Sequence, residues 1–131
     1  VFLNIPNVMS NVISIMSDKS HAIQNAFNEF NIHQITCYYC VMANMKKHCP
    51  IDKWDSILAG MRILNLCKCE IDFDLLSQLI VIQWRLLGMG DVADYFIKSY
   101  LCPIWKNWYI GCLPRPGNYY YYIITIIILL V

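Results

Sequence analysis

The chain has few charged side chains and almost no net charge. Ten Lys and Arg residues stand against nine Asp and Glu residues among 131 positions, which gives a formal charge of +1 at pH 7. A charge this small creates no global field that would draw the protein to nucleic acid or to a membrane. Charged residues make up 15% and apolar residues 58% of the sequence, which excludes the intrinsically disordered class. Any contact with DNA would therefore depend on local basic patches.

The sequence also lacks the segments that direct a chain to the secretory pathway or across a bilayer. Its opening residues, VFLNIPNVMSN, have neither the charged region nor the long apolar region of a signal peptide. The uncharged run at 119–131 is shorter than the ~20 residues that a membrane-spanning helix needs. We therefore expect a nuclear or cytoplasmic protein that is not secreted and does not contact a membrane. A tail-anchored protein that uses residues 119–131 is the alternative.

Seven cysteines are an odd number for a chain without a signal peptide, and they favour free, mostly buried thiols over a disulfide framework. Cys37 and Cys40 have the spacing of a zinc knuckle, and His48 and Cys49 would supply the other two ligands of a tetrahedral Zn²⁺ site. However, Cys37 lies in a predicted strand and the second pair is one helix away. Buried thiols are therefore favoured over zinc.

Hydrophobic periodicity predicts a mixed α/β chain that is mostly helical. The apolar run at 12–16 and the β-branched stretch at 32–39 are typical of strands. Apolar residues at helical spacing follow Asp18, Asp52, Asp72 and Asp91 and also begin near Val41, and Asp is a favoured N-cap residue. The helix after Asp72 is apolar over most of its circumference, which predicts burial between neighbouring elements, and Gly88 and Gly90 end it.

Several short motifs follow one another in a recognisable order: IMSD at 15–18, SHAIQNAFNEF at 20–30, ITCYYC at 35–40, VMANMKKHC at 41–49 and VADYFIKSYLCPIWKNWYIG at 92–111. Their order and spacing resemble the middle of the catalytic domain of Mutator-like element (MULE) transposases. In that family a strand ends at the second catalytic acidic residue, a helix and a strand ending in Cys-x-x-His follow, and an aromatic run later ends in Trp-Tyr-x-Gly. The resemblance covers roughly residues 12–111.

The resemblance implies a partial RNase H-like fold, in which a mixed sheet is flanked by helices and interrupted by a helical insertion. Residues 1–118 would form this partial domain, and residues 119–131 would form a low-complexity apolar tail. The implied chemistry is phosphodiester hydrolysis and strand transfer with two Mg²⁺ ions, about 4 Å apart, held by carboxylates. The implied partners are DNA and transposase subunits, without a small-molecule substrate.

The sequence departs from the family pattern at its catalytic positions. Asp18 matches the second catalytic carboxylate, whereas the first is expected well upstream and no acidic residue follows Asp94. Cys40 replaces the family His. Because one carboxylate does not offset the lost hydration of two divalent ions, we expect an inactive remnant in which Asp18 is a vestigial Mg²⁺ ligand. The chain also begins with Val, which suggests a partial gene or a processed fragment. Asp18 is equally well explained as a helix N-cap, and the two roles are compatible.

Two further groups of residues have a structural and a functional interpretation. Lys46, Lys47 and His48 would contact DNA phosphates, or would form a solvated cluster that complements the end of a helix, which is the commoner case. The aromatic residues at 105–109 would stack on bases or pack against the helical insertion, and packing is favoured. A small helical interaction protein is the alternative from a different functional class.

Overall fold

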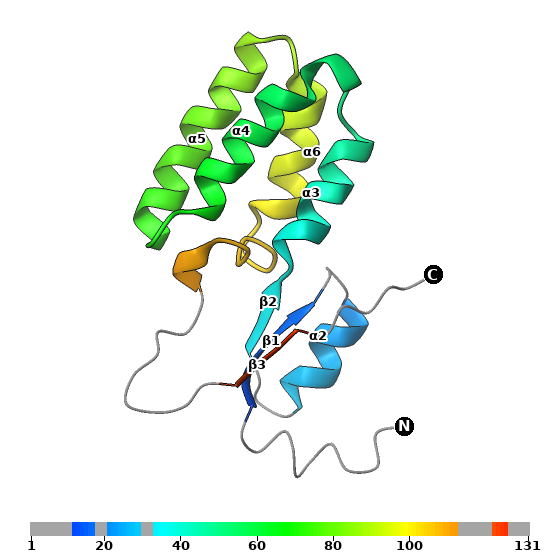
Figure 1. The fold of residues 1–131 in the computed structure, drawn as a ribbon, viewed down its shortest axis with the longest axis vertical. Coiled ribbons are helices and arrows are strands. Elements are labelled where there is room, and N and C mark those ends of the chain that lie inside the picture. The colour runs from blue at the N-terminus through cyan, green and yellow to red at the C-terminus, as the bar shows by residue number, and fades with distance from the viewer. Residues whose placement is uncertain (1–11, 18–20, 30–32, 113–121, 126–131) are drawn as a thin grey trace. The chain divides into compact units, whose positions relative to one another are not determined.

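A computed structural model describes residues 12–17, 21–29, 33–112 and 122–125 (Figure 1). The chain forms two compact units. The first unit contains residues 1–37 together with 114–131, and the second contains residues 38–113. The chain is mostly helical, as the sequence predicted, and its strands belong to the first unit.

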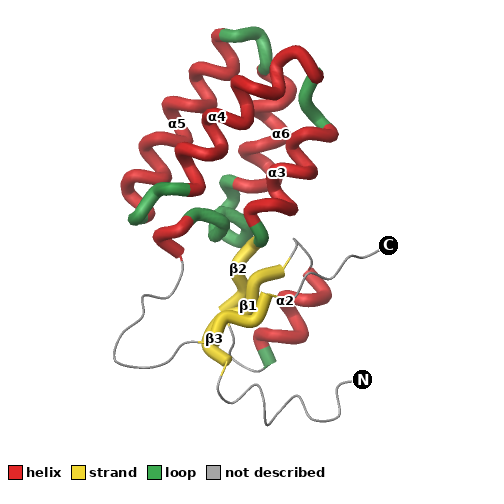
Figure 2. The backbone as a smooth tube through the Cα atoms, viewed as in Figure 1, coloured by secondary structure: helices red, strands yellow, loops and turns green. Residues whose placement is uncertain are grey.

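The first unit is built on a small parallel sheet. Its elements, in chain order, are β1 (Val12–Ser17), α2 (His21–Asn28), β2 (His33–Thr36) and β3 (Tyr122–Thr125). The three strands form one sheet (Figure 2), in the order β2-β1-β3. Both outer strands run parallel to β1. Parallel neighbours need a crossover connection, and α2 lies in the connection between β1 and β2. The predicted strand at 12–16 and the helix that follows it are therefore confirmed, whereas the predicted cap Asp18 lies outside the described residues.

The second predicted strand is shorter than the sequence indicated. Strand β2 ends at Thr36 and helix α3 begins at Tyr38, so the prediction of a strand through Tyr39 is wrong. Tyr38 and Tyr39 have strand propensity, but tertiary contacts override such preferences. The Tyr38 ring stacks on the Trp108 ring, with ring centroids 6.2 Å apart and an interplanar angle of 13°. Cys40 consequently lies in the first turn of a helix and does not end a strand.

The second unit is a bundle of four helices. Its elements are α3 (Tyr38–Lys47), the 3₁₀ turn η1 (Ile51–Lys53), α4 (Trp54–Asn65), α5 (Glu70–Leu86), α6 (Gly90–Tyr100) and the 3₁₀ turn η2 (Ile110–Cys112). Helix α4 contacts α3 and α5, and α6 also contacts α3 and α5, so the contacts form a closed ring (Figures 1 and 2). Because every helix has two neighbours, the bundle encloses an apolar core.

The core of the bundle takes residues from all four helices and from the segment after α6. Its largest fully buried side chains include Trp84, Trp108, Tyr100, Phe73 and Phe96. The other buried members are Val41, Met45, Ile57, Met61, Leu64, Cys67, Ile80, Val81, Met89, Val92, Ala93 and Tyr109. The apolar stripes predicted for α3, α4 and α6 therefore face the core.

The acidic residues predicted as helix caps do not cap the helices. The N-cap residues of α4, α5 and α6 are Lys53, Cys69 and Met89, and none of them makes a side-chain capping hydrogen bond. Asp52 lies in η1, and Asp72 and Asp91 lie in the first turns of α5 and α6. Helix α4 begins two residues after its predicted cap, whereas α5 and α6 begin two residues and one residue before theirs. A carboxylate in the first turn still complements the positive end of the helix dipole.

Helix α5 ends in a Schellman motif, in which two backbone hydrogen bonds cap the C-terminal end of the helix. The Met89 N–H donates to the Trp84 carbonyl at 2.9 Å, and the Gly88 N–H donates to the Arg85 carbonyl at 3.1 Å. Gly88 has a φ of 81°, which lies in the left-handed region that this motif requires. The apolar residue after Gly88, Met89, then reaches the core.

The change Gly88→Ala should lower the free energy of unfolding by about 1 kcal/mol, because a Cβ is disfavoured at positive φ. There is space for the methyl group itself, since its nearest neighbour would be the Lys53 Nζ at 3.6 Å. Urea denaturation followed by far-ultraviolet circular dichroism measures the change. Gly88→Asn is the control, and it should cost less because Asn tolerates the left-handed region. Equal stability of all three proteins would contradict this assignment.

Candidate functional site

The candidate catalytic residue follows the central strand of the sheet. Strand β1 ends at Ser17, and Asp18 is the next residue in the chain. Asp18 lies outside the described residues, so its side-chain geometry is not described. Within the described ranges, no group of three or more His, Cys, Asp or Glu side chains is placed to hold a metal ion.

The cysteine pair considered for zinc is divided between two kinds of structure. Cys37 follows β2 and is buried, whereas Cys40 is half-buried in the first turn of α3. None of the seven cysteines, which all lie in the described ranges, forms a disulfide. Burial raises the pKa of the Cys49, Cys67 and Cys112 thiols above the usual value. A raised pKa keeps these thiols protonated at neutral pH, and a protonated thiol is a poor nucleophile and a poor metal ligand.

The basic residues predicted to contact DNA lie at the C-terminal end of α3. Lys46 and Lys47 are in its last turn, and both side chains are exposed. The Lys46 Nζ lies 6.0 Å from the centre of the Trp54 ring, a distance at which a cation is weakly attracted to the ring face. Two adjacent exposed ammonium groups would meet a phosphate backbone without a sequence preference.

His48 is placed differently from the two lysines. Its Nδ1 lies 2.9 Å from the Asn44 carbonyl oxygen, and its ring stacks on the Tyr95 ring with centroids 3.8 Å apart. The imidazole therefore connects the end of α3 to α6, which is a structural role. The ring has an exposed side, but one nitrogen and one face are already in contact with the protein.

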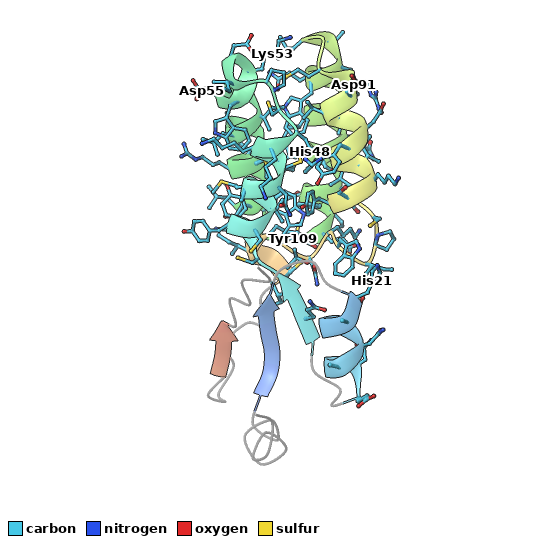
Figure 3. All side chains as sticks on the ribbon, turned by 90° about the vertical axis from the view of Figure 1, so that its right-hand side faces the viewer. His21, His48, Lys53, Asp55, Asp91 and Tyr109 are labelled. Carbon is cyan, nitrogen blue, oxygen red and sulfur yellow. The ribbon has the colours of Figure 1, made fainter. Side chains whose placement is uncertain are left out.

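The surroundings of the basic cluster carry both signs of charge. Lys53, Asp55 and Asp91 all lie at one end of the helical bundle, and Tyr109 lies at the other end (Figure 3). Lys53 donates a hydrogen bond from its Nζ to the Leu87 carbonyl at 3.1 Å. Carboxylates at this end of the bundle weaken the positive potential of the lysines. The cluster is therefore suited to a weak phosphate contact at most.

The Trp-Tyr-Ile-Gly motif is built into the bundle. Trp105, Trp108 and Tyr109 are 5%, 2% and 6% exposed, which confirms packing and leaves no face for stacking on bases. The Trp108 Nε1 donates to the Tyr100 carbonyl at 3.0 Å, and the Asn65 side-chain amide donates to the Trp108 carbonyl at 3.0 Å. The motif thus fastens the segment after α6 to the end of α4.

Gly111 completes this attachment. Its N–H donates to the Cys67 carbonyl at 2.8 Å, in the loop between α4 and α5. A Cβ on Gly111 would lie 2.4 Å from the carbonyl carbon and oxygen of Lys68 and 2.8 Å from the Cys69 nitrogen. Glycine is required here because two backbone segments approach closely. The sequence favoured packing for the aromatic residues of this motif, whereas the close approach at Gly111 is known from the structure alone.

Sequence reasoning missed two polar contacts that hold the bundle together. The Asn44 side-chain amide donates to the Tyr100 hydroxyl at 2.9 Å, and burial raises the pKa of Tyr100. The Lys106 Nζ lies 2.6 Å from a Glu70 carboxylate oxygen and 3.3 Å from an Asp74 oxygen. The hydrogen bond to Glu70 is the main reason that the pKa of Lys106 is raised. No sequence pattern marks these pairs, because their members are far apart in the chain.

No family model, characterised protein or solved structure matches this chain. Among the helices of the described ranges, none combines the length and the apolar character needed to cross a bilayer.

Proposed function

We propose that this chain derives from the middle of the RNase H-like catalytic domain of a Mutator-like DNA transposase and does not cleave DNA by itself. The observation that carries the proposal is the parallel β1–α2–β2 unit, with Asp18 directly after β1. In the family, a strand, an acidic residue, a helix and a second strand follow one another in this order.

The position of Asp18 relative to the strand also supports the proposal. In open α/β sheets, ligands bind outside the carboxyl ends of the strands. Strand β1 is the central strand of the order β2-β1-β3, and Asp18 follows its carboxyl end. The bundle of residues 38–113 comes directly after β2. A helical segment at this point agrees with the helical insertion that the resemblance implies.

Absence of catalysis follows from the number of carboxylates. Asp18 alone matches a catalytic position of the family within these residues, and no acidic residue follows Asp94. Two Mg²⁺ ions need several anionic oxygens to replace their lost water. Mg²⁺ is therefore the ancestral cofactor, and zinc at Cys37 and Cys40 is not part of the proposal. A residual contact with DNA would use Lys46 and Lys47, and other transposase subunits are the natural protein partners.

A gel-shift experiment with supercoiled plasmid, Mg²⁺ and the full chain tests both parts of the proposal. We expect weak retardation at low salt and no conversion to the nicked form. The double variant Lys46→Gln/Lys47→Gln should weaken binding and make the slope of log K against log salt shallower by about 1–2. The matched control is Lys68→Gln/Lys98→Gln, which removes the same charge from two other exposed lysines.

Two results would count against the proposal. Nicking that disappears in the Asp18→Asn variant would show that the chain is an active nuclease. Equal weakening by both double variants would show that binding reflects overall charge and that Lys46 and Lys47 form no specific contact. If the chain bound no plasmid even at low salt, the proposed DNA contact would be wrong, and the proposal of an inactive transposase remnant would stand without it.

A further inference from the structure

Helix α5 has two apolar faces on opposite sides. One faces the core of the bundle and contains Phe73, Ser77, Ile80, Val81 and Trp84. The other consists of Ile71, Leu75, Leu79, Ile82 and Leu86, which we call the outer stripe, and these side chains are 78%, 56%, 54%, 54% and 83% exposed. At 100° per residue the two sets lie on opposite sides of the helix. Within the described residues, the predicted burial of α5 between neighbouring elements therefore holds for one face of the helix and not for the other.

The spacing of the outer stripe is that of a helix-packing seam. Its members follow one another at intervals of four, four, three and four residues. This is the pattern with which one helix packs along another, because residues three and four apart share a face. Single exposed apolar residues are ordinary on a protein surface, but a continuous stripe along a whole helix marks an interaction site.

The stripe is complementary to itself when a second copy of α5 runs in the opposite direction. A two-fold axis between Gln78 and Leu79 brings Ile71 of one chain to the level of Leu86 of the other. The same axis brings Leu75 to the level of Ile82. Four of the five positions of the stripe then meet an apolar position, and the two copies of Leu79 lie one residue apart on either side of the axis. Such a surface satisfies the requirement of a two-fold interface, in which the same patch is used by both subunits.

The charges on α5 favour this antiparallel arrangement over a parallel one. The first turn carries Glu70 and Asp72, the last turn carries Arg85, and no charged residue lies between Asp74 and Arg85. Antiparallel helices place the acidic end of one beside the basic end of the other, whereas parallel helices place like charges together. The advantage is small, because Arg85 already pairs with Asp94 and Glu70 pairs with Lys106 within each chain. The helix dipoles also oppose each other favourably in this arrangement.

We propose that the outer stripe of α5 is the contact surface of a homodimer in which the two α5 helices pack antiparallel. With 17 residues, α5 is about 25 Å long. A single pair of helices of this length buries an area at the lower end of specific interfaces, so the dimer is weak and depends on concentration. This inference does not rest on the transposase proposal.

Sedimentation of the full chain over a range of concentrations tests the dimer, with two charged variants and their mixture. Leu75→Lys and Ile82→Glu each place two unpaired charges in the antiparallel interface. Each should raise the dissociation constant at least about 30-fold. Mixing the two variants should restore association, because the ammonium group introduced at position 75 of one chain meets the carboxylate introduced at position 82 of the other. The second pair of positions stays apolar. In a parallel dimer position 75 meets position 75, and mixing would restore nothing.

Ile51→Lys is the matched control, since Ile51 is 95% exposed and lies outside α5. It should leave the dissociation constant unchanged, and circular dichroism should show that all variants keep the helical content of the original chain. Three results would overturn the proposal: a monomer at every concentration, association that neither charged variant weakens, and a mixture that stays monomeric. The second result would point to association through another surface.

Discussion

Replacing Trp108 with alanine should lower the free energy of unfolding by about 3–5 kcal/mol, the range for aromatic truncation in a packed core. Trp108 is 2% exposed, and its ring contacts the Phe73 ring edge-on with centroids 5.3 Å apart. It also contacts the Phe96 ring at 6.0 Å. The substitution would leave a large cavity where α5, α6 and the Trp-Tyr-Ile-Gly motif meet. Urea denaturation followed by circular dichroism gives the value without using tryptophan fluorescence.

Trp108→Phe separates the contribution of packing from that of the hydrogen bond. Phenylalanine keeps an aromatic ring in the core but removes the Nε1 donor from the Tyr100 carbonyl. We expect a loss of about 1–3 kcal/mol, the cost of an unsatisfied buried acceptor. If Trp108→Ala cost no more than about 1 kcal/mol, well below the range for a core aromatic residue, the motif would not belong to the core. A functional role for its aromatic rings would then have to be considered again.

Gly111→Ala should destabilise the chain by about 3 kcal/mol or more, at the upper end of the range for overpacking. The added methyl group would meet the carbonyl group of Lys68 at 2.4 Å, and backbone atoms move less easily than side chains. The substitution would therefore separate Gly111 from Cys67 and break their 2.8 Å hydrogen bond. A thermal melt of this variant should show a clearly lowered midpoint.

Gly90→Ala is the matched control for Gly111→Ala. Gly90 is the first residue of α6, and a Cβ there would have only the Arg85 side chain near it, at 3.9 Å. Because alanine loses less backbone entropy than glycine in a helix, the control should be neutral or slightly stabilising. A Gly111→Ala protein as stable as the Gly90→Ala protein would show that the loop between α4 and α5 moves away at little cost.

The sequence predicted the elements that depend on local patterns. The apolar run before Asp18 became β1, and the stripes on α3, α4 and α6 became the core, because periodicity directly reports which face is buried. The boundaries of helices were predicted less well. Asp72 is a good N-cap by composition, yet α5 begins at Glu70 and its N-cap residue is Cys69.

Features that depend on distant parts of the chain were not predictable. The apolar residues of α5 gave no indication that half of them face outward, because periodicity does not show how many neighbours a helix has. The contact of Gly111 with Lys68 joins residues far apart in sequence. The pairing of Lys106 with Glu70 is equally remote. For the candidate site, the sequence identified Asp18 and the two lysines of α3, but not that His48 is held against Tyr95.

The pairing of β3 with β1 has a consequence for synthesis on the ribosome. Val12 pairs with Tyr122, so the sheet joins strands that are made at very different times. The four helices, in contrast, form one continuous stretch that is complete once Leu113 has been made. Contacts between neighbouring segments form faster than those that close a long loop. The bundle can therefore assemble before β3 has been made. Until β3 pairs with β1, one edge of β1 is open to other chains.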